Sequence, residues 1–77
     1  MMTENHSETI EKISKRIKQL RIEKGYTSYI HFADEHNMQG KQYWKIEEAK
    51  VDYRMSTLLR VLKGLDISLE EFFKGLD

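Results

Sequence analysis

The sequence has 77 residues, in which 13 Lys and Arg balance 13 Asp and Glu, and it contains no cysteine. This length supports one hydrophobic core and leaves little room for a substrate cleft. The lack of cysteine excludes disulfides and thiolate zinc sites and fits a reducing compartment. The polar, acidic start does not resemble a signal peptide, and no segment has the apolar length of a membrane span. We therefore expect a single cytoplasmic domain over residues 1–77, with 1–6 as a flexible tail and no contact with a membrane.

A helical apolar stripe predicts the first element, from about Ser7 to Lys24. Its apolar residues recur at spacings of three and four, as on one face of a helix: Ile10, Ile13, Ile17 and Leu20. Gly25 follows as a stop signal. Residues 8–24 carry six Lys or Arg against three Glu. Because the net charge of the chain is zero, only such a local surplus can attract a polyanion.

Two short helices are predicted next, at residues 28–36 and 40–49. Thr27 or Ser28 can cap the first of them, since a hydroxyl there accepts a hydrogen bond from a free amide. Asn37 is among the few residue types besides glycine that accept a left-handed backbone, so it predicts a tight turn between the two helices. The inward positions of these two helices are Phe32, Ala33, Tyr43 and Ile46.

A loop at Lys50 to Met55 precedes two further helices, at residues 56–65 and 68–75. Ser56 is expected to cap the first, and Ser68 with Glu71 forms a capping box that opens the second. No strand is expected, because every sustained apolar pattern has a helical period. The predicted fold class is therefore all-α, with five helices. The predicted core consists of Ile13, Ile17, Leu20, Phe32, Ala33, Tyr43, Ile46, Leu58, Leu59, Leu62, Leu65, Ile67 and Phe72.

Four stretches of the chain together resemble the Cro/C1-type (XRE) family of helix-turn-helix repressors: RIKQLRIEKG, FADEHNM, YWKIEEAK and STLLRVLKGLDISLEEFF. The resemblance spans about residues 13–75. It implies a compact lambda-repressor-like fold in which the second and third helices form the helix-turn-helix. It also implies that Glu47, in the family's Ile-Glu pair, binds Arg21 and so ties the recognition helix to the first helix.

Two positions depart from the family pattern. The glutamine usually found in the first turn of the second helix is absent, and the segment between Gly25 and Phe32 has one residue more than the common pattern. Gly40 stands where the family often presents a long polar side chain at the start of the recognition helix. Specificity would therefore depend on the neighbours of Gly40.

The resemblance implies that the helix at 40–49 enters the major groove of double-stranded DNA, where each base pair shows a distinct pattern of donors and acceptors. From this helix the residues expected to face DNA are Gln39, Lys41, Gln42, Trp44 and Lys45. Glutamine can bond adenine on two atoms and lysine can donate to guanine. If Trp44 is exposed, it can contact thymine methyls, sugar or another protein. The alternative is that the Trp44 side chain is partly buried against Tyr53 or Met55.

Phosphate contacts are expected on either side of the recognition helix. They would come from Thr27, Ser28 and Tyr29 at the start of the second helix, where amides favour anions, and from Lys50 and Arg54 in the following loop. Without DNA, the same residues are ordinary caps and surface side chains, and the lysines and glutamines are a solvated helix face.

These residues bear on three classes of function. A sequence-specific DNA-binding transcriptional regulator, acting as a homodimer on two half-sites, fits the basic first helix and the polar third helix. A protein-interaction module that keeps the repressor fold without strong DNA binding is the alternative, and it is favoured by zero net charge, Gly40 and an exposed Trp44. No residues of the sequence favour the third class, an enzyme. His6, His31 and His36 lack the carboxylate or cysteine partners that a metal site needs. No cofactor, metal or small-molecule substrate is therefore expected.

Overall fold

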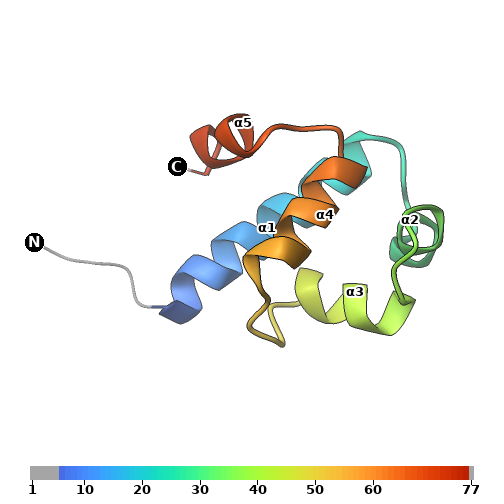
Figure 1. Ribbon diagram of the computed structural model, residues 1–77, viewed down its shortest axis with the longest axis horizontal. Coiled ribbons are helices and arrows are strands. Elements are labelled where there is room, and N and C mark those ends of the chain that lie inside the picture. The colour runs from blue at the N-terminus through green and yellow to red at the C-terminus, as the bar shows by residue number, and fades with distance from the viewer. Residues whose placement is uncertain (1–5, 77) are drawn as a thin grey trace, which may run out of the picture.

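The computed structural model describes residues 6–76, which form five helices and no strand (Figure 1). The helices are α1 (His6–Glu23), α2 (Tyr29–Glu35), α3 (Gly40–Glu47), α4 (Met55–Gly64) and α5 (Leu69–Lys74). The predicted all-α class is confirmed, and each helix end lies within two residues of its expected position. His6 begins α1 and so does not belong to the predicted tail. The rest of that tail, residues 1–5, lies outside the described residues.

The first four of the described helices end in the same way, because a residue with positive φ follows the last turn of each. The φ angle is 99° at Gly25, 59° at Asn37, 56° at Ala49 and 57° at Asp66. After the turn, the next amide donates to a carbonyl five residues back, as the amide of Met38 does to the carbonyl of Ala33 at 2.8 Å. This is the Schellman arrangement, which reverses the chain in few residues. Asn37 thus makes the turn between α2 and α3 that the sequence predicts.

Serine side chains cap the starts of two short helices. The Ser28 hydroxyl accepts a hydrogen bond from the amide of His31 at 3.3 Å and begins α2. The Ser68 hydroxyl accepts one from the amide of Glu71 at 3.1 Å, as the predicted capping box requires. Each bond satisfies an amide that has no partner within the helix.

The predicted cap of α4 is wrong. The helix begins at Met55 with Arg54 as its N-cap, and no side chain makes a capping hydrogen bond there. Ser56 lies inside the first turn, because the backbone becomes helical one residue before the polar side chain that looked like a start signal. The start of α4 therefore keeps amides that can face water or an anion.

The core is assembled from all five helices. Its buried residues are Ile13, Ile17, Phe32, Ala33, Tyr43, Ile46, Leu58, Val61, Leu62, Leu65 and Phe72. Leu20 and Ile67 are partly buried against it. Leu59 was expected in the core but is 46% exposed. Helical spacing explains the difference, since Leu58, Leu62 and Leu65 already occupy the inward face and Leu59 is rotated about 100° from Leu58.

α2 and α3 are the most closely packed pair of helices. Ala33 is fully buried, and the ring centres of Phe32 and Tyr43 are 5.0 Å apart. The end of α4 also approaches α2 closely. A Cβ atom at Gly64 would lie 3.0 Å from Phe32 Cζ, which is too close for an undisturbed contact. Gly64 thus lets α4 support the helix-turn-helix, a role that the sequence analysis did not assign to it.

The C-terminal helix is held on α1 by one arginine. Arg16 Nε donates to the carbonyl oxygen of Phe72 at 2.8 Å, and its guanidinium carbon lies 5.4 Å from the centre of the Phe72 ring. Phe72 itself is fully buried. Among the described helices, none combines the length and the apolar character that crossing a membrane would require.

Candidate nucleic-acid interface

The two faces of α3 differ sharply in burial. Tyr43, Ile46 and Glu47 are buried with exposures of 0%, 6% and 7%. Lys41 and Gln42 are exposed, and Lys45 is half-buried. At about 3.6 residues per turn, Lys41 and Lys45 lie opposite the buried face. α3 therefore presents two cations and an amide side chain on its outer surface.

The remaining predicted contacts of this helix lie at its start and flank. Gln39 is the N-cap of α3, makes no side-chain capping bond and is exposed. Trp44 is 38% exposed, so much of its ring surface is reachable from solvent. All five residues predicted to face DNA from this helix are thus accessible at least in part.

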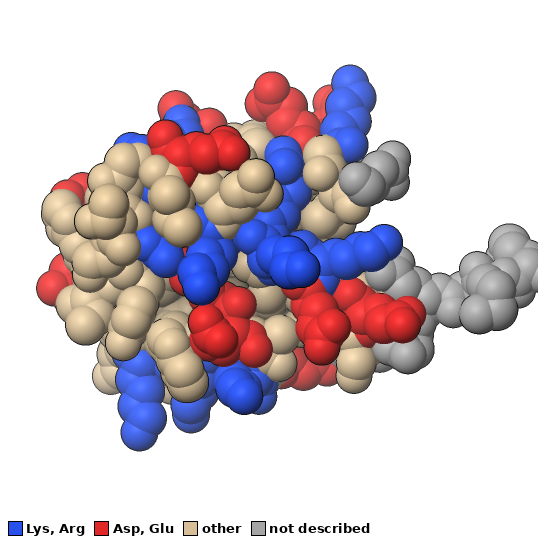
Figure 2. Space-filling view, turned by 180° about the vertical axis from the view of Figure 1, so that it is seen from behind, with Lys and Arg blue, Asp and Glu red and all other residues tan. Residues whose placement is uncertain are grey.

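Charge is distributed unevenly over the surface (Figure 2). On the face shown, a band of Lys and Arg crosses the middle of the molecule and is bordered by Asp and Glu. Along the lower edge, which α3 forms in Figure 1, Lys and Arg side chains project outward. A chain of zero net charge thereby keeps positive groups where α3 meets solvent.

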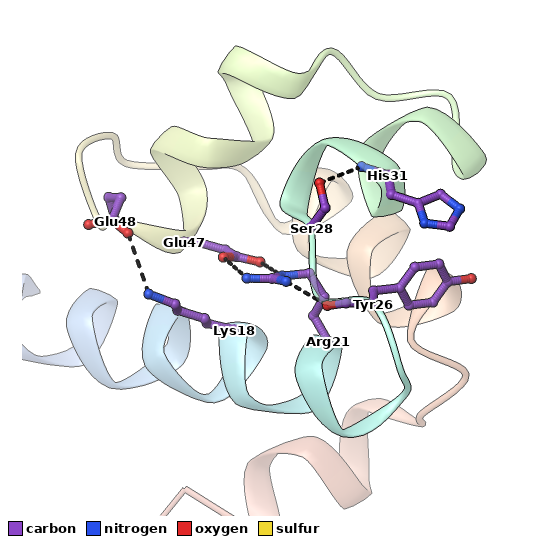
Figure 3. A network of polar contacts seen from close by, with 7 residues as sticks. All are labelled: Lys18, Arg21, Tyr26, Ser28, His31, Glu47 and Glu48. Carbon is purple, nitrogen blue, oxygen red and sulfur yellow. Dashed lines mark hydrogen bonds and ion pairs between the residues drawn. The ribbon is translucent and has the colours of Figure 1, made fainter.

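A buried ion pair joins α1 to the end of α3 (Figure 3). Arg21 Nε and Nη2 donate to the two carboxylate oxygens of Glu47 at 2.7 and 3.1 Å, and Nη1 donates to the carbonyl oxygen of Tyr26 at 2.6 Å. The hydrogen bond to Glu47 raises the pKa of Arg21 above its usual value. Both side chains are almost fully buried. The pair that the family resemblance implied is present, and it fixes the orientation of α3 on the scaffold.

The start of α2 lies beside the turn before α3. Thr27 and Ser28 are exposed, whereas Tyr29 is half-buried and packs against the core. The Ser28 hydroxyl uses a lone pair to cap His31, and its own proton remains able to reach an outside acceptor. The structure thus brings the first two of these residues to the surface and only part of the third.

An exposed polar cluster follows on the outer side of α2. The Tyr26 hydroxyl donates to Glu35 Oε1 at 3.0 Å, and His31 Nε2 lies 2.7 Å from Glu35 Oε2. The hydrogen bond from Tyr26 lowers the pKa of Glu35, and the same bond raises the pKa of Tyr26. Together these contacts attach the loop after α1 to α2.

The loop between α3 and α4 divides into outward and inward residues. Lys50 and Arg54 are exposed. Tyr53 packs against the core, its hydroxyl lies 3.5 Å from the hydroxyl of Ser14, and burial raises its pKa. The two basic residues of this loop are therefore exposed, whereas Tyr53 is directed toward the core.

Ile30 is a surface residue that the sequence analysis did not single out for binding. It is 50% exposed, and its Cγ1 atom would lie 3.6 Å from a Cβ atom at Gly40. The signal that could have identified it is its position two residues before Phe32, which rotates it away from the inward face of α2. Ile30 therefore borders the start of α3.

The outer side of α3 carries hydrogen-bonding side chains. Within residues 6–76, no cluster of three or more His, Cys, Asp or Glu side chains is arranged to hold a metal ion. The exposed groups of α3 are hydrogen-bond donors and acceptors on a helix that the buried ion pair joins to α1.

Comparison with known proteins gave no matching family model and no matching curated sequence. Among solved structures, the chain is similar to the wild-type restriction-modification controller protein C.Esp1396I, with 30% sequence identity and a TM-score of 0.80. The match covers 95% of this chain and 91% of that protein. The resemblance carried by the sequence motifs is thereby confirmed, and the chain belongs with this controller protein to the Cro/C1-type (XRE) family of helix-turn-helix regulators.

Proposed function

We propose that this protein is a sequence-specific DNA-binding transcriptional regulator that inserts α3 into the major groove of double-stranded DNA. The observation that carries this proposal is the exposed side of α3, where Lys41 and Lys45 lie opposite the buried residues of a helix-turn-helix and Gln42 is exposed on the flank. A helix fits the major groove, and these side chains can bond purine edges there. The similarity to a restriction-modification controller protein supports the same class of function.

Phosphate contacts would hold the helix in place on both sides. Arg54 is exposed at the start of α4, where no side chain caps the helix amides, so the cation and the helix dipole both favour an anion. Lys50 adds a second cation from the same loop. Thr27, Ser28 and the hydroxyl of Tyr29 would hold the opposite strand near α2. We place this activity in the cytoplasm, as the cysteine-free sequence predicts.

Substitution of a base-contacting residue and substitution of a phosphate-contacting residue are expected to change DNA binding in different ways. Gln42→Ala or Lys45→Ala should reduce the preference for one base pair by about 1–3 kcal/mol, because each reader discriminates at a single position. Arg54→Ala should weaken binding to all sequences and reduce the slope of log affinity against log salt by about one unit. The measurement is a titration of duplexes selected from a random pool, repeated at several salt concentrations.

Lys74 provides the matched control for these substitutions. It is exposed on α5, on the opposite side of the molecule from α3 in Figure 1, so Lys74→Ala should leave both preference and salt slope unchanged. If the wild-type protein binds no duplex at low salt, the proposal is wrong. A protein-interaction module anchored by the exposed Trp44 would then be the better account, and capture of a partner in the absence of DNA would test it.

We further propose that the protein acts as a homodimer through the outer faces of α4 and α5. Each helix carries an exposed apolar pair at a spacing of four residues: Met55 and Leu59 on α4, and Leu69 and Phe73 on α5, with exposures of 57%, 46%, 41% and 39%. Residues at this spacing share one face of a helix. Leu76, just after α5, is partly buried against the core of the protomer. A two-fold dimer would present two copies of α3 to half-sites about one helical turn apart.

Sedimentation velocity tests the dimer. Wild-type protein should sediment as a dimer, and Leu59→Lys or Phe73→Lys should shift it to monomer without loss of helical circular dichroism, because a charge would be buried in the interface. Ile22→Lys is the control, since Ile22 is similarly exposed, at 49%, but belongs to α1 and not to α4 or α5. Sedimentation of wild-type protein as a monomer, both free and with a palindromic duplex, would exclude the dimer.

A further inference from the structure

Ile30 has an unusual position for an exposed aliphatic side chain. Single apolar residues are common on protein surfaces and need no explanation by themselves. Ile30, however, is half exposed on the first turns of α2 and lies over the first residue of α3, as the 3.6 Å distance from its Cγ1 atom to a Cβ at Gly40 shows. It therefore borders the start of α3, beside Gly40.

Gly40 and Ile30 together replace polar surface by apolar surface at this point. Gly40 has no side chain with which to reach a base, and the family's long polar side chain is missing there. The Cγ1 methylene of Ile30 lies 3.6 Å from the point where the Cβ atom of such a side chain would be. Trp44, one turn further along α3 from Gly40, continues the apolar surface with a 38% exposed ring.

The major groove offers one apolar group to such a surface. Every base edge there presents donors or acceptors, and only thymine adds a methyl group, at its C5 atom. An aliphatic side chain gains by burying that methyl, whereas it would leave a base donor or acceptor without a partner. The apolar side chain of Ile30 is therefore complementary to the 5-methyl group of a thymine.

We propose that Ile30, which lies beside Gly40 at the start of α3, is a specificity-determining residue that contacts the 5-methyl group of a thymine in each half-site. This inference depends on the proposed insertion of α3 into the major groove. It assigns to α2 a base contact that Lys41, Gln42 and Lys45 cannot make, because their polar ends select hydrogen-bonding edges. The apolar contact compensates for the side chain that Gly40 lacks.

Replacement of single thymines by deoxyuridine tests the contact directly, since deoxyuridine lacks only the methyl group. In the duplex that the wild-type protein selects, one such replacement in a single half-site should weaken binding about fourfold, the effect of one buried methyl. Ile30→Ala should bind the thymine and deoxyuridine duplexes equally at that position. Ile22→Ala, which truncates a similarly exposed isoleucine on α1, should keep the fourfold difference.

The outcomes separate this inference from the proposed function. If the wild-type protein selects a duplex but is indifferent to every deoxyuridine replacement, Ile30 reads no methyl group and the inference is overturned while DNA binding stands. The same conclusion follows if Ile30→Ala keeps the discrimination, or if Trp44→Ala rather than Ile30→Ala removes it. Failure to select any duplex would instead overturn the proposed function, and this inference with it.

Discussion

Replacing Arg21 by methionine is expected to lower the free energy of unfolding by about 3–5 kcal/mol. The substitution leaves the Glu47 carboxylate buried at 7% exposure without the two hydrogen bonds, at 2.7 and 3.1 Å, that compensate its loss of water. It also removes the donor to the carbonyl oxygen of Tyr26. Urea unfolding followed by circular dichroism measures the loss.

The double-mutant cycle identifies the cause of that loss. If the cost comes from a stranded charge, replacing Glu47 by leucine as well should restore much of the stability, because two apolar groups can occupy the site without unpaired charge. A coupling energy near zero would mean that the pair contributes no mutual stabilisation. Lys18 and Glu48 offer a contrast, since they approach to 3.9 Å with 49% and 38% of their side chains exposed. Lys18→Met should change stability by less than about 1 kcal/mol.

The helices of this protein could be predicted from the sequence because local signals agree with the packing. Gly25 and Asn37 are residue types that accept the left-handed backbone, and both end helices where expected. Ala49 and Asp66 also adopt this conformation, at φ 56° and 57°. Alanine carries no such signal, so the end of α3 at Glu47 was predicted two residues late.

The positions that sequence reasoning missed depend on contacts between helices. Gly64 leaves room for the side chains of Phe32 and His36 at the end of α2, and nothing in the neighbouring residues of α4 indicates how close they come. Ile30 likewise acquires its place beside Gly40 only when α2 and α3 are packed together. Periodicity identifies a broad apolar face on α4 but does not decide which edge of it meets the core, and for this reason Leu59 was assigned wrongly.

Leu62→Ala is expected to lower the free energy of unfolding by about 2–5 kcal/mol, because Leu62 is 2% exposed and its loss leaves a cavity in the only core that the described helices share. Leu59→Ala is the matched control on the same helix. At 46% exposure it should cost less than about 1 kcal/mol at low protein concentration. If α4 and α5 form the dimer interface, the cost of Leu59→Ala should grow with concentration, since dimerisation stabilises the folded state by mass action. The cost of Leu62→Ala should be present at every concentration. A change below about 0.5 kcal/mol on truncating Leu62 would show that the side chain is not packed in the core.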